Sequence, residues 1–324
     1  MARRPPLFWL GCGLLVGIAC VALLAPVLAP HDPRLPSGRP LASPSREHLL
    51  GTNDLGQDVL SQLIEGSRST LIVAAAVTAI STALSWAVGL VAGLGRRADA
   101  PLMGLTDLLL ALPSVPLYLL VLTLLGPSRR TVVLVLALLS WPAMARVVRA
   151  VVIRTRSAPY VEASRALGAS DRHVLRRHLL PATLDVLPTK LVLTVRFAVF
   201  AEATLAFLGL GSSGAISWGT MLSWAFSDPL LFARPVWAWQ VLPPALAIVL
   251  LVLATTWVAE TVNLDGRRAD PGRSGRARPR GRLGGQDDRE RMTGVSRPID
   301  THPSSPGAHG PGGTGVGDPV RKPL

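Results

Sequence analysis

Lysine and cysteine are scarce in this sequence of 324 residues, and their scarcity limits the chemistry that it can support. The only lysines are Lys190 and Lys322, and neither stands in the Gly-Lys-Ser/Thr context that a phosphate-binding Walker A loop requires. Cys12 and Cys20 lie in one apolar run, which is typical of packing residues rather than of a disulfide. No His-Glu-x-x-His pattern and no metal-spaced Cys/His cluster occurs. We therefore expect no enzyme chemistry, no bound metal or cofactor, and no ATPase site in this chain.

Charged residues are also missing from long parts of the sequence. Hydrophobic residues make up 49% of the chain, and the mean hydropathy of +0.40 is high for a soluble globular protein. Apolar stretches of 18 or more nearly uncharged residues recur, and each is long enough to cross a hydrocarbon core of about 30 Å as a helix. We therefore expect an all-α, polytopic membrane protein with six transmembrane helices in a lipid bilayer. The apolar runs are 7–29, 69–95, 102–125, 131–153, 186–210 and 236–260.

The positive charge of the chain is distributed unevenly. The formal net charge is +13, and the basic residues alternate with the apolar runs, so positive cytoplasmic loops explain them better than binding to nucleic acid does. Segment 145–182 has eight arginines and two acidic residues, whereas segment 30–68 has four arginines and five acidic residues. This bias predicts a multi-pass protein of the cell membrane with both termini in the cytoplasm. The run 7–29 is longer than a signal-peptide core, and we expect it to be an uncleaved span.

Composition divides the chain into three parts. Residues 1–68 hold the first span and an external loop, and residues 69–265 hold the other five spans with a charged cytoplasmic elbow at 159–181. Residues 266–324 are rich in Arg, Pro and Gly and have almost no large apolar side chains. Such a segment buries too little surface to offset the entropy of ordering, so we expect a disordered cytoplasmic tail.

Segment 162–181, EASRALGASDRHVLRRHLLP, interrupts the apolar pattern with charge. Its ionised side chains rule out a transmembrane segment, because each costs roughly 2.5–3.5 kcal/mol at the bilayer centre. The pattern predicts one short helix that ends at Gly168, a residue tolerant of positive φ. Ser170 caps a second short helix, Asp171 suits its first turn, and Pro181 limits it. A compact knob of this kind suits docking to a partner protein, and a merely solvated amphipathic loop is the alternative.

The elbow resembles the EAA loop of binding-protein-dependent ABC importer permeases. The likeness rests on Glu-Ala-Ser at 162–164, on Gly168 four residues after Ser164, and on His-Leu-Leu-Pro at 178–181. The family pattern has alanine where Ser164 stands, which is a small change in size.

Two other stretches resemble the dipeptide/oligopeptide/nickel branch of that family. One is LLGTNDLGQDVLSQLIEGSR, in which Gln57 and Gln62 stand where arginines are usual. The other is AEATLAFLGLGSSGAISWGTML, in which the outer loop is shortened. The likeness covers roughly residues 48–260, and the three motifs occur in the expected order.

The resemblance implies the type I ABC importer permease fold and a non-catalytic translocation subunit. In that family the elbow is the coupling helix that sits in a groove of a cytoplasmic ATPase. The implied partners are a homologous permease subunit in a heterodimer, two cytoplasmic ABC ATPase subunits that bind the ATP, and an extracytoplasmic substrate-binding protein. The implied cargo is a di- or oligopeptide, with nickel or another small solute as the alternative. The residues that match the coupling role are Glu162, Ala163, Ser164, Gly168, Asp171, His178 and Pro181.

Four further ionisable residues fall in or near the expected spans. Glu202 and Arg196 could line a translocation path and meet peptide termini, or they could be structural. Asp107 and Asp185 lie near the cytoplasmic ends of spans, where we expect solvation or pairing with arginine. An ion-coupled secondary transporter would need intramembrane acidic groups, and Glu202 alone gives that interpretation little support.

Overall fold

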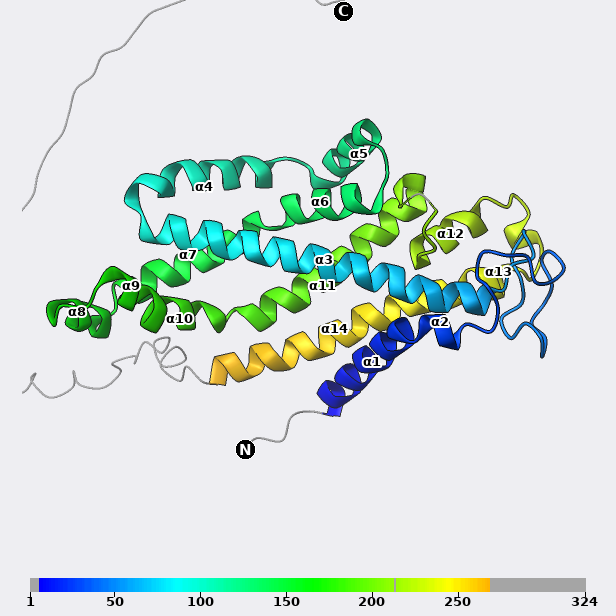
Figure 1. Cartoon of the computed structure of the whole chain (residues 1–324), viewed down its shortest axis with the longest axis horizontal. Helices are drawn as coiled ribbons and strands as arrows, with labels where there is room; N and C mark the ends of the chain where they lie inside the picture. Colours follow the sequence, from blue (N-terminus) through cyan, green and yellow to red (C-terminus); the bar gives the residue numbers. More distant parts are fainter. Residues whose placement is uncertain (1–5, 213, 269–324) are drawn as a thin grey trace, which may run out of the picture. The chain divides into compact units, whose positions relative to one another are not determined.

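The computed structural model describes residues 6–212 and 214–268, all of which belong to one compact unit of the chain. These residues form helices and connecting segments, and the described ranges hold no named strand, only an isolated antiparallel bridge between Thr52 and Asp58. Figure 1 shows the helices as a bundle of long, roughly parallel rods with short helices at both ends. Most of the expected tail, from residue 269 onward, lies outside the described residues.

The chain begins with α1 (Pro6–Leu23), a short α2 (Ala25–Leu28) and an irregular segment that leads to the long helix α3 (Val59–Leu94). Asp58 caps α3, because its side chain accepts a hydrogen bond from the Ser61 N–H at 2.8 Å. The apolar run predicted a helix from residue 69, whereas α3 begins ten residues earlier. With 36 residues and a rise of about 1.5 Å per residue, α3 is about 54 Å long, which exceeds the thickness of a hydrocarbon core.

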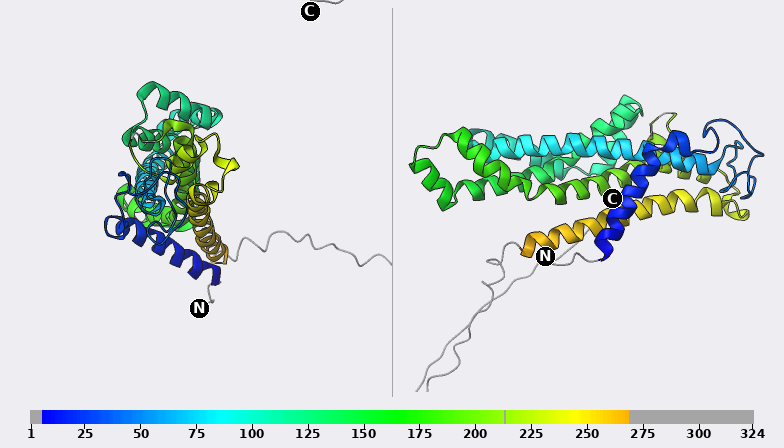
Figure 2. Two further views of the ribbon diagram at one scale, coloured as in Figure 1. Left: turned by 90° about the vertical axis from the view of Figure 1, so that its right-hand side faces the viewer. Right: turned by 60° about the horizontal axis from the view of Figure 1, so that its bottom comes forward.

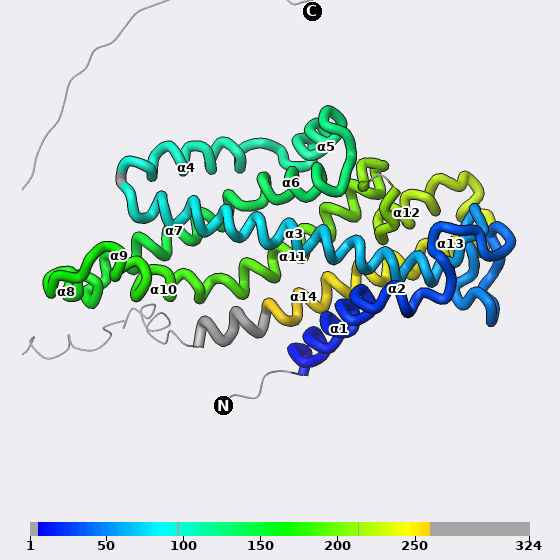
Figure 3. Tube along the Cα trace, in the orientation of Figure 1, coloured from blue at the N-terminus to red at the C-terminus, as the bar shows by residue number. Residues whose placement is uncertain are grey.

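The third apolar run does not form one straight helix. It is divided into α4 (Arg96–Ala111) and α5 (Ser114–Leu125), which meet at an angle of 91°. Leu112 is extended (φ −77°, ψ 137°) because the Pro113 ring disfavours helical geometry in the residue before it. The apolar run 102–125 therefore forms a bent pair of helices rather than one straight helix. Figure 3 shows the resulting turn in the chain between α4 and α5.

The fourth run is also bent, but less strongly. It consists of α6 (Arg129–Ser140) and α7 (Pro142–Arg156), which meet at 41° beside Trp141. The Ser85 hydroxyl of α3 donates a hydrogen bond to the Trp141 carbonyl oxygen at 3.0 Å and so links the kink to the long helix. The proline at the start of α7 has no N–H to donate, which accounts for the break.

The second half of the chain contains the elbow and two further long helices. The elements are α8 (Pro159–Ala166), α9 (Asp171–Val174), the π-helical turn η1 (Leu175–Leu179), α10 (Leu180–Leu184), α11 (Leu187–Leu205), the π-helical turn η2 (Ala206–Leu210), α12 (Trp218–Phe226), the 3₁₀ turn η3 (Leu231–Ala233), α13 (Trp237–Gln240) and α14 (Leu242–Arg268). Capping by Ser217 fixes the start of α12, because its hydroxyl accepts from the Thr220 N–H while the Thr220 hydroxyl accepts from the Ser217 N–H.

Close backbone approach joins α3 to α7. A Cβ atom added at Gly89 would lie 2.7 Å from Val148 Cβ, and one added at Gly93 would lie 2.6 Å from Val152 Cγ1. Both distances are too short for a real side chain, so glycine is required at each position. Small residues four apart let two membrane helices pack closely, as this pair does. The main apolar core lies nearer the start of α3, where Val59, Val73 and Val77 belong to the same cluster as residues of α6 and α11.

The first and last helices also pack against each other. A Cβ atom added at Gly11 of α1 would lie 2.9 Å from the Ala254 carbonyl oxygen of α14. Figure 2 shows α1 crossing α14 at an angle. The N-terminal span therefore contacts the C-terminal span of the bundle.

By length and composition, four helical stretches of the described residues can cross a membrane: α1, α3, α11 with η2, and α13 with the first part of α14. The two bent pairs, α4–α5 and α6–α7, raise the number to six if each pair is one span. This agrees with the six apolar runs, although the third and fourth spans are broken. Many large apolar side chains on these helices are exposed, as expected for surfaces that face lipid or a partner subunit.

Candidate functional site

The first half of the elbow has the local structure that its sequence predicts. Helix α8 ends in a Schellman motif, in which the Gly168 N–H donates to the Arg165 carbonyl at 2.9 Å and the Ala169 N–H donates to the Ser164 carbonyl at 3.1 Å. Gly168 has φ +87°, a conformation that side chains disfavour. The prediction that glycine ends this helix with a positive φ is confirmed.

The second half of the elbow differs from the prediction at its end. Ser170 caps α9 as expected, with its hydroxyl accepting from the His173 N–H at 3.3 Å. Pro181, however, does not end the helical path, because it lies in the first turn of α10, which continues to Leu184. The wide π-helical turn η1 comes directly before this proline. A π turn inserted into a helix changes which carbonyls need a donor, so the missing N–H of proline is tolerated there.

A small apolar core of its own holds the elbow together. Side chains from α7, α8, α9 and η1 are less than 2% exposed and pack against one another. They are Val148, Val152, Val161, Val174 and Leu179. Because this core fixes both short helices to the end of α7, the elbow is a packed knob rather than a loose loop.

The outer surface of the knob is open. Glu162, Ala163 and Gly168 are exposed, and Leu167 between them is 89% exposed. A leucine that projects this far from a packed base has an apolar surface without a neighbour. The structure therefore places three of the predicted residues at one exposed tip.

The remaining predicted residues lie along the sides of the elbow. Ser164 and His178 are half-buried, and the His178 ring lies 5.6 Å from that of Tyr160, centroid to centroid. Asp171 and Pro181 are exposed, and the Asp171 carboxylate is 3.3 Å from an Arg165 guanidinium nitrogen. An exposed pair of this kind contributes little stability.

Basic side chains surround the second half of the knob. An open hollow on α9 and η1 is lined by Ser170, Arg172, His173, Arg176 and Arg177. The three arginines make this rim positive, which suits an acidic partner surface.

The two candidate pathway residues do not lie together. Glu202 of α11 is 6% exposed, and its carboxylate oxygen lies 3.5 Å from the Thr70 hydroxyl of α3. Arg196, six residues earlier on the same helix, is exposed. Six residues correspond to about 600° of helical rotation, which leaves the two side-chain directions roughly 120° apart. The two side chains therefore lie on different faces of α11. Within this chain they form no common site.

The other two ionisable residues have ordinary surroundings. Asp107 forms an ion pair with Arg146 of α7, and both side chains are about half exposed or more. Asp185 is exposed at the end of α10. A second pair joins the same helices, with the Arg149 guanidinium donating to the Asp99 carboxylate at 2.6 Å. These pairs hold α4 against α7, which agrees with the structural interpretation of Asp107.

Two features of the structure were not anticipated from the sequence. Lys190 is 2% exposed, and its ammonium group donates to the Ser81 hydroxyl of α3 at 2.8 Å. A lone lysine in an apolar run was the available signal for this contact. The second feature is the convergence of His31, His48 and Asp58, which are too widely and irregularly spaced to match a metal-binding motif.

The elbow lies at one end of the helical bundle, and the segment between α2 and α3 lies at the opposite end, together with α13 (Figure 1). With its several apolar spans between these ends, the chain is a multi-pass membrane protein of the permease class. Residues 81–265 match the family described as binding-protein-dependent transport system inner membrane component, and the chain belongs to this family. The matched range contains the whole elbow.

Similar proteins have names that refer to peptide transport. A Brucella suis protein provisionally named a peptide permease is 38% identical over 253 residues, which cover 77% of this chain and 83% of the relative. A second Brucella suis protein, provisionally named a permease of a peptide transport system, is 33% identical over 262 residues, covering 80% and 86%. The dipeptide transport system permease protein DppC of Bacillus subtilis is 34% identical over 222 residues, covering 68% and 69%.

Proposed function

We propose that this chain is the transmembrane permease subunit of an ATP-driven importer of di- or oligopeptides, and that it forms half of the translocation pathway. The family to which the chain belongs supports the transport role. The names of the similar proteins support peptides as the cargo. The observation that carries the proposal is the packed elbow with an exposed tip, which lies inside the matched part of the chain.

The elbow is the surface that couples this chain to a cytoplasmic ATPase. Glu162, Ala163 and Gly168 lie at its exposed tip, and the small side chains at 163 and 168 let a groove approach the backbone closely. The sequence offers no Walker A loop, so ATP hydrolysis belongs to separate ABC ATPase subunits. The basic hollow on α9 and η1 supplies charge complementarity at the rim of that interface.

Polar contacts connect the base of the elbow to the transmembrane helices. The Trp86 indole of α3 donates to the Thr183 hydroxyl of α10 at 3.2 Å, and the Arg156 guanidinium donates to the Leu94 carbonyl at 2.8 Å. A force applied to the knob is therefore transmitted to α3, and through α10 to α11, which follows it in the chain. Alternating access would follow from movement of these helices when the ATPase subunits close and open.

The complete transporter contains further subunits. A homologous permease supplies the other half of the pathway, two ATPases bind the two elbows, and an extracytoplasmic protein delivers the cargo. The eight arginines of segment 145–182 support a cytoplasmic position for the elbow and for both termini. Segment 30–68 then faces the binding protein at the opposite end of the bundle. Arg196, exposed on α11, is available to the second permease, whereas Glu202 lies against α3.

A matched pair of glycine variants tests the coupling role. Gly168 and Gly126 both have positive φ, at +87° and +81°, and neither has an atom within 4 Å of an added Cβ. Gly168→Val and Gly126→Val therefore introduce similar backbone strain, of order 1–3 kcal/mol. We expect both variants to reach normal membrane levels, and only Gly168→Val to lose ATPase pull-down and peptide uptake in reconstituted vesicles. Equal uptake by the two variants would mean that the elbow has no coupling role.

Two assays separate the proposed cargo and energy source from their alternatives. Competition by unlabelled dipeptide but not by Ni²⁺ supports peptide transport, and the reverse supports a small-solute permease of the same branch. Uptake that stops with vanadate but persists after collapse of the proton gradient supports ATP-driven transport. The opposite response would indicate an ion-coupled secondary transporter.

A further inference from the structure

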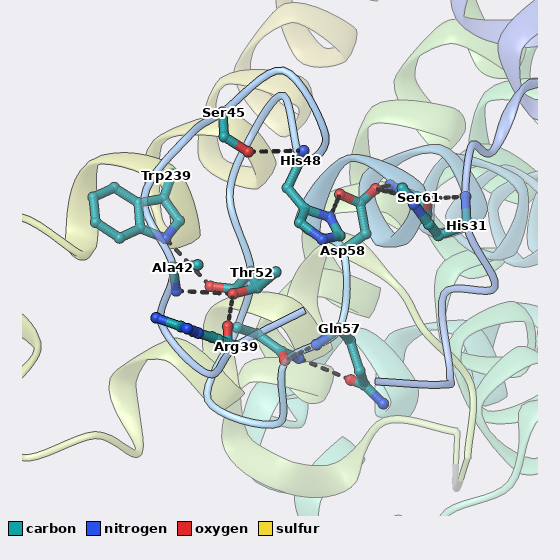
Figure 4. Close-up of polar contacts among 11 residues, drawn as sticks. His31, Arg39, Ala42, Ser45, His48, Thr52, Gln57, Asp58, Ser61 and Trp239 are labelled. Carbon is teal, nitrogen blue, oxygen red and sulfur yellow. Dashed lines mark hydrogen bonds and ion pairs between the residues drawn. The ribbon is translucent and has the colours of Figure 1, made fainter. Parts of the chain in front are cut away.

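His31, His48 and Asp58 come from three separate parts of the chain and meet beside the N-terminus of α3. One potential metal-ligating atom of each residue lies within 4.8 Å of the others. The His48 Nδ1 atom is 3.0 Å from Asp58 Oδ1, and the His31 Nδ1 atom is 4.0 Å from Asp58 Oδ2. Figure 4 shows both imidazoles directed toward the same carboxylate. We call these three residues the His-His-Asp cluster.

The surrounding structure holds the cluster in place. Asp58 is 1% exposed, and its Oδ2 atom accepts hydrogen bonds from the Ser61 N–H at 2.8 Å and from the Ser61 hydroxyl at 2.7 Å. The same hydroxyl oxygen accepts from the His31 backbone N–H at 3.1 Å. The His48 backbone N–H donates to the Ser45 hydroxyl at 3.1 Å. Outer hydrogen bonds of this kind orient the ligands of metal sites.

One ring nitrogen of the cluster has no hydrogen-bond partner. The His31 Nδ1 atom is buried and makes no hydrogen bond, although the His31 side chain as a whole is 31% exposed. A buried polar atom left without a partner is unfavourable and needs an explanation. Because this atom faces a buried carboxylate and a second imidazole, a cation bound among the three would satisfy it. The exposed part of His31 provides access from solvent.

We propose that His31, His48 and Asp58 bind one divalent transition-metal ion of the zinc–nickel class. Two imidazole nitrogens and one carboxylate oxygen suit these metals, whereas Ca²⁺ and Mg²⁺ prefer oxygen ligands alone. Metal–ligand bonds of about 2.0–2.2 Å place tetrahedral ligand atoms roughly 3.4 Å apart. The 3.0 Å between His48 Nδ1 and Asp58 Oδ1 is close to this value, and the three ligand atoms, which lie within 4.8 Å of one another, would move closer together around a bound ion. A water molecule would fill the fourth position on the exposed side of His31.

The bound ion would join three parts of the chain. His31 lies just after α2, His48 lies in the irregular segment, and Asp58 caps α3. The same segment is attached to α13, because the Trp239 indole N–H donates to the Thr52 carbonyl at 3.3 Å (Figure 4). Metal binding would therefore fix the segment between α2 and α3 against the end of the bundle, in addition to the transport role proposed above.

Direct metal binding tests the proposal. The full-length chain is stripped with a chelator in lipid nanodiscs and titrated with Zn²⁺ by calorimetry, and with Co²⁺ by the visible absorption of the tetrahedral ion. We expect one tight site per chain. His31→Gln, His48→Gln and Asp58→Asn should each weaken Zn²⁺ binding by about tenfold or more, since losing even an outer-shell partner costs about 10–100-fold. Asp58→Asn retains the oxygen that caps α3, so loss of binding would not reflect loss of the helix start.

Two control variants separate this site from unspecific binding. Glu47→Gln removes an exposed carboxylate next to His48, and it should leave the Zn²⁺ affinity unchanged. A double variant, His173→Gln with His178→Gln, removes two histidines whose rings lie 6.1 Å apart on the elbow, and it should also retain the tight site.

Several results would overturn the proposal. They are the absence of a stoichiometric tight site in the parent protein, or unchanged Zn²⁺ affinity in His31→Gln and His48→Gln. A melting temperature that depends on pH but not on Zn²⁺ would identify the cluster as a simple imidazole–carboxylate contact. These measurements read metal binding itself, so their outcome does not depend on whether the chain transports peptides.

Discussion

Leu167 offers the most quantitative test of the docking role of the elbow. Its side chain is 89% exposed at the tip of the knob, between the end of α8 and Gly168. If the elbow enters a groove of an ATPase, this leucine becomes buried there. Leu167→Ala removes three carbon groups, each worth about 0.8 kcal/mol on burial, so a full burial predicts a loss of about 2.4 kcal/mol of binding free energy. This corresponds to a roughly 50-fold weaker Kd, because every 1.4 kcal/mol or so is tenfold.

The same substitution should leave the isolated protein unaffected. An exposed leucine buries little apolar surface within the isolated protein, so its truncation should change the free energy of unfolding by less than about 0.5 kcal/mol. Leu55→Ala is the matched control, because Leu55 is 61% exposed in the segment between α2 and α3, far from the elbow in Figure 1. It should leave both stability and ATPase binding unchanged.

The assay uses surface plasmon resonance to measure binding of the purified ATPase subunits to the nanodisc-embedded protein. Leu167→Ala should raise the Kd by one to two orders of magnitude, depending on how deeply the side chain is buried, while the melting temperature stays constant. A change in Kd of less than about twofold would refute burial of Leu167 in the interface. A similar loss in Leu55→Ala would show that the effect is not local to the elbow.

Three further predictions address packing, the tail and the orientation in the membrane. Gly89→Ala should lower the melting temperature, because the new Cβ would lie 2.7 Å from a valine Cβ of α7. Gly104→Ala, where an added Cβ has no atom within 4 Å, should raise it slightly because alanine has the higher helix propensity. Equal effects would argue against the close helix contact. Truncation after Asp270 should leave membrane levels and peptide uptake unchanged, and loss of uptake at normal levels would assign the tail a specific role. In a variant without the native cysteines, an impermeant thiol reagent should label Ser45→Cys in intact cells and Ala163→Cys only in opened cells; the reverse pattern would invert the proposed topology.

Local sequence signals were sufficient for the elbow. Gly168 ends α8 because the chain needs positive φ there, and Ser170 caps α9 because its hydroxyl reaches an N–H three residues on. Both effects act over a few residues, so they can be recognised in the sequence alone. Pro181 was misjudged because the helix around it contains a π turn, and the energy of that turn depends on packing at the base of the knob.

The apolar runs likewise indicated where the membrane spans lie, but not how straight they are. Run length and hydropathy report transfer into lipid, which is nearly independent of neighbouring helices. The 91° break at Pro113 required more, because proline permits a bend whose size is set by the helices that pack on either side. The early start of α3 at Val59 was missed because an apolar run does not include helical residues that are polar, and several of the first ten residues of α3 are polar.

By itself, the sequence determined the class of this protein, the number of its apolar spans and the local form of its elbow. Only the tertiary structure decided that Lys190 meets Ser81, that Glu202 and Arg196 face different ways, and that His31, His48 and Asp58 converge. The physical reason is the range of the interactions. Caps, glycine turns and hydrophobic length depend on neighbours within a few residues, whereas these contacts join residues that only the packing of whole helices and the folding of a long irregular segment bring together.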